Sequence, residues 1–246
     1  MNLEHQHGGQ GEPILVLLHG LGATGDVWSG VRETARERWP GRWLIPDLRG
    51  HGGSAHARPY TLGQHAADVA ALLGRWGPTV LVGHSMGGVV ALALASGWFG
   101  VPVVGVVGLG IKVVWTDEEL ARVREFSNRP VRWFDDYPGA AARYLRVAGL
   151  DGLAEPDSPL ARGGVREQGG RFRLAADPRA AEIGPPDMRR LLTAARAPAI
   201  RNPRAAHPNG ARAAMTNNGK ITDTRISWSH PRLRQRGPIG EYPAVA

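Results

Sequence analysis

The chain has 246 residues, enough to form one compact domain, with or without an insertion, and to bury a sizeable hydrophobic core. It contains no cysteine, so disulfides, thiolate metal sites and a cysteine nucleophile are excluded. No run of about eighteen apolar residues is present, and residues 1–9 lack the basic start and apolar run of a signal peptide. We therefore expect a cytoplasmic protein without a membrane partner.

The formal net charge is +8, and almost all of it belongs to one segment. Residues 200–236 contain eight Lys and Arg residues and one acidic residue, Asp223, whereas the rest of the chain has 22 basic and 21 acidic residues. No nucleic-acid-binding motif accompanies the basic segment, so we expect no nucleic-acid partner. The alternative, a tail that binds polyanions, predicts a steep salt dependence of binding.

In the first half of the chain, short apolar runs alternate with helical patterns. This alternation is typical of a mostly parallel sheet covered by helices, because central parallel strands are apolar on both faces. The expected strands are residues 13–18, 42–46, 79–83 and 101–111. A helix capped by Thr61 is expected between the second and third strands, and a fully buried helix at residues 87–98 after the third.

The composition changes at Trp115, where Thr116 begins an amphipathic helix and the connectors become rich in Gly, Pro and Asp. Further short helices are expected up to residue 195, with no β-rich run among them. We predict an N-terminal core of residues 1–111, a helical lid of residues 112–195, and an atypical C-terminal part of the core, residues 196–246. The candidate pocket under the lid is apolar.

The strongest candidate for a functional residue is Ser85, in the run Gly83-His84-Ser85-Met86-Gly87. This run follows an expected strand directly and precedes an expected helix. In a sharp turn of this kind, the residues two positions before and after the serine must be glycine, and the hydroxyl projects above the sheet edge. The helix N-terminus favours developing negative charge. We therefore predict that Ser85 is a catalytic nucleophile.

A tetrahedral oxyanion requires two hydrogen-bond donors, and the backbone N–H groups of Leu21 and Met86 are the natural pair. His19, just before Leu21, is either a general base or a structural ring bonded to loop backbone, and the structural role is favoured. His5 and His7 form an H-x-H pair that lacks further metal ligands, so we expect no metal site. In the loop 46–54, a structural role of the charged residues is favoured over a phosphate cradle, because the Lys and spacing of a P-loop are missing.

Three segments together resemble the α/β-hydrolase superfamily, in its single-domain serine esterase and cofactor-free peroxidase-like branch. They are LLHGLGATGDVW (17–28), PDLRGHGGS (46–54) and VGHSMGG (82–88). The resemblance covers about residues 12–111. It implies an eight-stranded, mostly parallel sheet, a helical lid, and a serine triad without a cofactor. Ser85 in place of aspartate argues against the dehalogenase and epoxide-hydrolase branches.

The acid and histidine of such a triad should follow the serine, and here the resemblance fails. Ile200 begins a segment without sustained periodicity where two more strands are expected. Either this part has diverged, so that His207 or His230 completes the triad with Asp223 or Asp117, or residues 200–236 are read in a wrong frame through two compensating indels in the gene. Among these histidines we select His230 as the triad histidine. Asp117 fits a helix cap better than the acid of a triad.

The predicted function is hydrolysis of a small ester, thioester or lactone through an acyl-enzyme on Ser85. A small-molecule substrate with an acyl group is the expected partner. Two alternatives remain open: hydrolysis of a carbon–carbon bond on the same residues, and a catalytically silent binding protein with an incomplete triad. The acid and base after Ile200 would discriminate between them.

Overall fold

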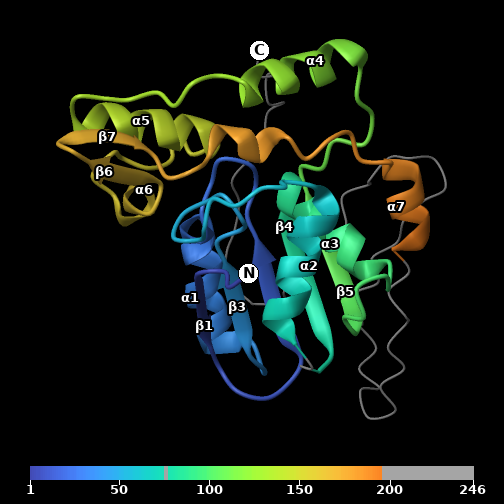
Figure 1. Ribbon diagram of the computed structural model, residues 1–246. Coiled ribbons are helices and arrows are strands. Elements are labelled where there is room, and N and C mark those ends of the chain that lie inside the picture. Colours follow the sequence, from blue (N-terminus) through green and yellow to red (C-terminus); the bar gives the residue numbers. More distant parts are fainter. Residues whose placement is uncertain (75–76, 196–246) are drawn as a thin grey trace, which may run out of the picture. The chain divides into compact units, whose positions relative to one another are not determined.

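The computed structural model describes residues 1–74 and 77–195, and within these ranges five strands form one sheet in the order β1-β3-β2-β4-β5 (Figure 1). The four strands from β2 to β5 are parallel, and β1 pairs antiparallel with β3 at the edge. The strands are β1 (His5–Gly8), β2 (Ile14–Leu18), β3 (Trp43–Pro46), β4 (Thr79–His84) and β5 (Val103–Leu109). The predicted fold class is confirmed, and the four strands expected in the first half of the chain are present.

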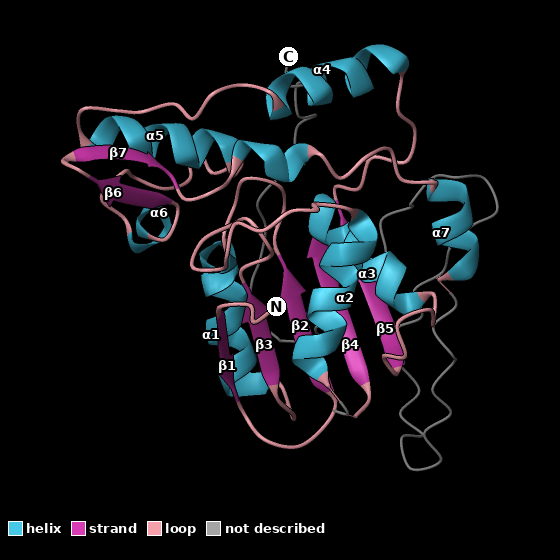
Figure 2. Cartoon of the chain, viewed as in Figure 1, coloured by secondary structure: helices cyan, strands magenta, loops and turns pink. Residues whose placement is uncertain are grey.

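Helices cover both faces of the sheet, as Figure 2 shows. Because successive side chains of a strand point to opposite faces, the central strand β2 contributes to two cores. Ile14, Val16 and Leu18 pack with helices α2 and α3, whereas Leu15 and Leu17 pack with η1 and α1. These helices are η1 (Gly25–Trp28), α1 (Ser29–Arg38), α2 (Leu62–Leu73) and α3 (Met86–Ala95). The apolar run of β2 thus belongs to a strand buried on both sides.

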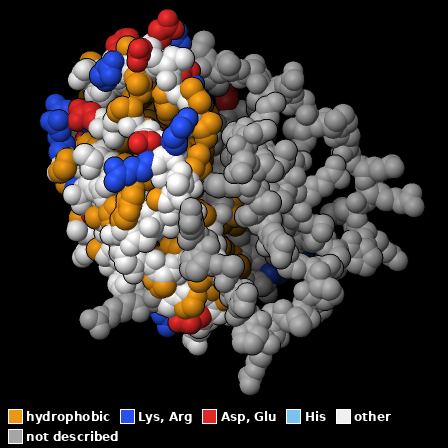
Figure 3. Space-filling model, turned by 90° about the vertical axis from the view of Figure 1, so that its right-hand side faces the viewer, with side chains coloured by type: hydrophobic (Ala, Val, Ile, Leu, Met, Phe, Trp, Pro, Cys, Tyr) orange, Lys and Arg blue, Asp and Glu red, His pale blue; other side chains and the backbone are white. Residues whose placement is uncertain are grey.

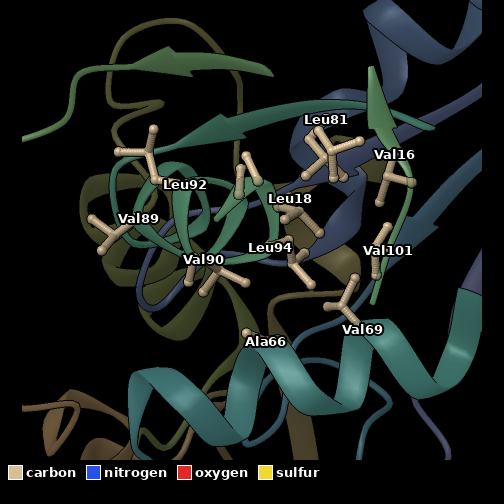
Figure 4. Packing of buried hydrophobic residues seen from close by; sticks show 14 of the residues in the cluster. Val16, Leu18, Ala66, Val69, Leu81, Val89, Val90, Leu92, Leu94 and Val101 are labelled. Carbon is tan, nitrogen blue, oxygen red and sulfur yellow. The ribbon is translucent and has the colours of Figure 1, made fainter. Parts of the chain in front are cut away.

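The larger core is shown in Figure 4, where Val16 and Leu81 of the sheet lie in one cluster with Val69 of α2 and Leu94 of α3. Every residue of α3 is buried, as the apolar sequence predicts. Helix α3 therefore packs against both the sheet and α2. This position fixes the start of α3, directly after β4, rigidly above the sheet edge.

The predicted start of α2 is confirmed. Thr61 Oγ1 accepts a hydrogen bond from the backbone N–H of Gln64 at 3.1 Å, and Gly74 follows the last turn. Side-chain caps of this kind satisfy N–H groups that the helix itself leaves unpaired.

Residues beyond β5 form a layer next to the edge of the sheet at which strands β2 and β4 end (Figure 1). The expectation of no β structure there was wrong, because β6 and β7 form an antiparallel hairpin. Gly169 and Gly170, both with positive φ, make its two-residue turn, a geometry that joins antiparallel strands without splaying them. The elements of this layer are α4 (Asp117–Ser127), α5 (Tyr137–Val147), α6 (Pro159–Arg162), β6 (Val165–Gln168), β7 (Arg171–Leu174) and η2 (Pro178–Ala181).

Helix α7 (Met188–Ala194) packs differently from the rest of this segment. Its Met188 and Leu191 are buried in the larger core, on the side of the sheet covered by α3. The division into core and lid at residues 111 and 195 stays a prediction, and the packing of α7 favours a lid that ends before Met188. No helix among the described residues is long and apolar enough to cross a bilayer.

Charge on the described surface is mixed. On the face shown in Figure 3, Lys and Arg side chains alternate with Asp and Glu and with hydrophobic groups, and they form no uniformly basic area. This agrees with the near neutrality of the chain outside residues 200–236. The basic segment itself, the proposed frame change and the expected strands after Ile200 all lie outside the described residues.

Candidate active site

Ser85 lies in the turn between β4, which ends at His84, and α3, which begins at Met86. Its backbone has φ 49° and ψ −116°, and no other non-glycine residue in the described ranges has a positive φ. The strained turn is held by a hydrogen bond from the Ser85 N–H to the carbonyl of Leu109, at 2.8 Å. Strain of this kind persists only where the surrounding structure enforces it.

The glycines around Ser85 are required by close backbone contacts. A Cβ at Gly83 would clash with the carbonyl of Gly87, and a Cβ at Gly87 would clash with the carbonyl of Leu18. The turn can therefore form only when both positions lack a side chain. This is the physical reason for the spacing from which the sequence predicts the turn.

The loop that follows β2 lies against the serine turn. A Cβ at Gly20 would be 3.4 Å from the Cβ of Ser85, which places the next residue, Leu21, beside the turn. The N–H of Leu21 donates to no group in the part of the chain that is described. Met86 is the first residue of α3, where an N–H has no acceptor within the helix. Both N–H groups remain the predicted oxyanion donors.

Two buried histidines hold this loop in place. His19 Nε2 accepts the N–H of Leu48 at 2.8 Å, and His51 Nε2 accepts the N–H of Gly22 at 3.0 Å. Each ring therefore carries its proton on Nδ1, from which it donates to a backbone carbonyl. Burial lowers the pKa of His19 to about 4 and that of His51 to about 3, so both rings are neutral at pH 7. The structural interpretation of His19 is confirmed.

Charged residues fix the loop after β3, as the sequence predicts. Asp47 accepts the N–H groups of Gly25 at 2.7 Å and Gly53 at 2.8 Å and so joins two loops. Arg49 forms a buried, two-pronged ion pair with Asp68 of α2, with N–O distances of 2.6 and 2.9 Å. The loop that carries His51 is thereby attached to the body of the fold.

Replacing Asp68 with asparagine is expected to lower the free energy of unfolding by about 3–5 kcal/mol, because the guanidinium of Arg49 would stay buried without a counter-ion. Chemical denaturation at pH 7 measures this change. Glu33→Gln is the matched control. Glu33 pairs with Arg32 and Arg36 but its side chain is 55% exposed, and loss of such a surface pair costs at most about 1 kcal/mol. Equal effects of the two substitutions would contradict the importance of the buried pair.

The other sequence candidates lie away from Ser85 or outside the described ranges. Asp117 is the exposed first residue of α4, and Thr116 and Glu119 form a reciprocal capping box around it. His5 bonds the carbonyl of Leu3 through Nδ1, and its ring centroid is 5.4 Å from that of His7. No group of three or more possible metal-ligating side chains exists among the described residues. The predicted His230, with His207 and Asp223, falls outside them.

A cavity of about 380 Å³ lies between the Leu21–Gly22 loop and the segment beyond β5. Its walls include Phe126 of α4, Val147 of α5 and Leu174 of β7. Ser85 is not among the lining residues. The loop Gly20–Gly22 lies between Ser85 and the cavity, because Gly20 packs against Ser85 while Leu21 and Gly22 line the cavity. The cavity thus lies beside the loop that packs against the serine turn, and the lid over it stays a prediction.

The outer layer is attached to the core loops by hydrogen bonds. The Tyr144 hydroxyl of α5 meets Thr24 Oγ1 at 3.1 Å, and the Tyr60 hydroxyl donates to Asp177 at 2.7 Å. The cavity also contains a residue that the sequence analysis missed, Arg143 of α5. Its spacing of four residues from Val147 places both side chains on one helix face, but nothing in the local sequence shows that this face lines a cavity.

Comparison with known proteins agrees with this architecture. The sequence model of the alpha/beta hydrolase family matches residues 15–235. The chain is 37% identical over 93 residues to lipase LipV of Mycobacterium tuberculosis, which covers 37% of the chain and 34% of the lipase. It is 41% identical over 97 residues to a pimeloyl-[acyl-carrier protein] methyl ester esterase of Aeromonas hydrophila, covering 39% of the chain and 36% of the esterase.

The matches to these two proteins therefore span only about a third of their length. Among solved structures, an alpha/beta hydrolase from Novosphingobium aromaticivorans superposes with a TM-score of 0.60 at 24% identity. That superposition covers 78% of this chain and 73% of the other, and it supports the fold.

Proposed function

The chain belongs to the alpha/beta hydrolase family, and from this we propose that it hydrolyses a small ester, thioester or lactone through an acyl-enzyme on Ser85. The observation that carries the proposal is the strained Ser85 backbone, with φ 49°, held between β4 and the start of α3. A backbone of this kind exposes the hydroxyl at a helix N-terminus and beside a second loop. Esterase and lipase relatives support the same reaction class.

In the proposed reaction, Ser85 Oγ attacks the carbonyl carbon of the substrate while a base removes its proton. The oxyanion receives hydrogen bonds from the N–H groups of Leu21 and Met86, which are fixed before the substrate arrives. The leaving alcohol, thiol or ring oxygen takes up the proton. Water then attacks the acyl-enzyme and releases the acid. We propose His230 as the base, because a triad histidine follows the serine in chain order.

A catalytically silent binding protein is the second candidate. Ser85 Oγ has no hydrogen-bond partner within the described part of the chain, and a cavity is nevertheless present beside the Leu21–Gly22 loop. Carbon–carbon bond hydrolysis would use the same serine and the same oxyanion donors. A simple activated ester separates the silent protein from both enzymes.

A fluorophosphonate probe is expected to label the protein at Ser85 alone, because labelling requires a serine activated by a base beside oxyanion donors. Intact mass and peptide mapping identify the labelled residue. Ser85→Ala should abolish labelling. Ser96→Ala is the control, since Ser96 Oγ donates to the carbonyl of Ala93 at 2.6 Å at the other end of α3.

Rapid labelling at any other serine would overturn the assignment of Ser85. If no residue is labelled, the fold is unaffected and the silent binding protein becomes the better description. The rate of labelling therefore reports whether a base reaches Ser85.

A further inference from the structure

The cavity beside the Leu21–Gly22 loop is mostly apolar but carries excess positive charge. Three arginines line it, Arg129, Arg132 and Arg143, and the acidic residue among its lining residues is Asp177. The oxygens of Asp177 are already used: one accepts the Tyr60 hydroxyl at 2.7 Å and the other a backbone N–H at 2.9 Å. The single negative charge of Asp177 can balance at most one of the three arginines.

Two of the three arginines have partners close by. Arg129 is paired with Glu125 at 2.8 Å, one turn earlier in α4. The guanidinium of Arg132 lies 4.9 Å from the centre of the Phe134 ring. Arg143, by contrast, is half-buried and forms no ion pair or hydrogen bond with any other described residue. A half-buried guanidinium without a counter-ion has the strongest need for an anionic ligand.

Helix α5 shows that Arg143 differs from its neighbours on the same helix. Arg143 and Val147 line the cavity, whereas Arg146 has a side chain that is 63% exposed and lies 3.7 Å from Asp151. The buried hydroxyl of Tyr144, bonded to Thr24, ties the helix to the core loops at this point. The position of Arg143 above the Leu21–Gly22 loop is therefore fixed by packing.

We propose that Arg143 anchors an anionic group, a carboxylate or a phosphate, at the far end of the acyl substrate. The inference rests on the proposed ester hydrolysis and specifies its substrate class: a short apolar chain with the scissile carbonyl at one end and an anion at the other. The apolar walls, such as Phe126 and Leu174, accommodate the chain. A planar guanidinium binds either anion with two parallel hydrogen bonds.

The test compares para-nitrophenyl esters of equal chain length: the neutral pentanoate, the monoester of glutarate, and the ester of a phosphonobutanoate. In the wild type, kcat/KM should be higher for one of the charged esters than for the neutral one. Arg143→Gln should lower this preference by roughly 10- to 100-fold, mainly through KM, because a charge-assisted hydrogen bond is lost. Arg143→Lys should restore part of it. Arg146→Gln is the matched control and should keep the wild-type preference.

A second measurement separates this inference from the proposed reaction. Glutarate and the phosphonate are titrated calorimetrically into Ser85→Ala protein with and without Arg143→Gln. If the anions bind in a way that depends on Arg143 but the wild-type protein hydrolyses none of the esters, the proposed reaction is refuted and the anion site is kept. Ester hydrolysis without a preference for charged esters, or equal behaviour of Arg143→Gln and Arg146→Gln, would overturn the anion site alone. The ester that wild type prefers identifies the anion.

Discussion

Replacing Ser85 with alanine is expected to lower kcat for a simple aryl ester by about 10⁶-fold if a working triad is present, as in serine hydrolases generally. The variant loses the only atom that forms the acyl-enzyme, while both oxyanion N–H groups are part of the backbone and remain. A residual rate above that in water is therefore expected. Stopped-flow or plate assays with para-nitrophenyl acetate measure the change.

The fold should tolerate this substitution. Ser85 Oγ forms no hydrogen bond with the described part of the chain, and alanine has the same Cβ in the same strained backbone. Unchanged thermal unfolding of Ser85→Ala would attribute the lost activity to chemistry. Ser96→Ala, at the end of α3, should keep wild-type kcat. If wild type and Ser85→Ala are equally slow, no triad operates and the chain binds ligands without converting them.

How much of the fold the sequence predicts depends on how local each signal is. The cap of α2 at Thr61 and the capping box at Thr116 depend on residues three positions away, and both are present in the structure. The apolar runs predicted all four parallel strands of the described residues, because a mostly buried strand is apolar on both faces and shows no regular polar alternation. The short antiparallel strands were missed, although β5, at the other edge of the described sheet, was predicted. Strand β1 (His5–Gly8) and the β6–β7 hairpin are short and carry His, Gln and Arg, and long-range pairing or their turns define them.

The same distinction applies to the site. Ser85 was predictable because its turn depends on Gly83 and Gly87, two residues away, through contacts that exclude a Cβ. Arg143 was not, because its importance depends on how α5 lies above the Leu21 loop more than a hundred positions earlier. No local pattern encodes that arrangement.

The stability of the fold should fall steeply in mild acid, because three histidines are buried in their neutral form. Burial lowers the pKa of His19 and His65 to about 4 and that of His51 to about 3, from an ordinary value of 6.5. Between pH 6.5 and 4 the unfolded chain binds protons that the folded chain does not. The free energy of unfolding therefore increases with pH across this window and decreases as the pH falls. Each histidine accounts for a loss on the order of 3 kcal/mol.

Protonation would also break specific contacts. A second proton on His51 would occupy Nε2, which accepts the N–H of Gly22, and would displace the loop that carries Leu21. The same proton on His19 would release the N–H of Leu48. Stability is therefore expected to decline below about pH 6.5, whereas these contacts should persist in the folded chain until the pH approaches 4.

His65 offers the sharpest test of this acid sensitivity. Its ring is buried on α2, stacks on Tyr60 with centroids 6.4 Å apart, and neither ring nitrogen has a hydrogen-bond partner among the described residues. His65→Leu removes one of the three protonation events and no hydrogen bond. Denaturant unfolding from pH 7.5 to 4.5 should show a smaller loss of stability for this variant than for wild type. His7→Gln, on an exposed strand position, should follow wild type at every pH. An identical slope for His65→Leu and wild type would contradict the assignment, because it would mean that the buried ring takes up its proton as readily as one in water.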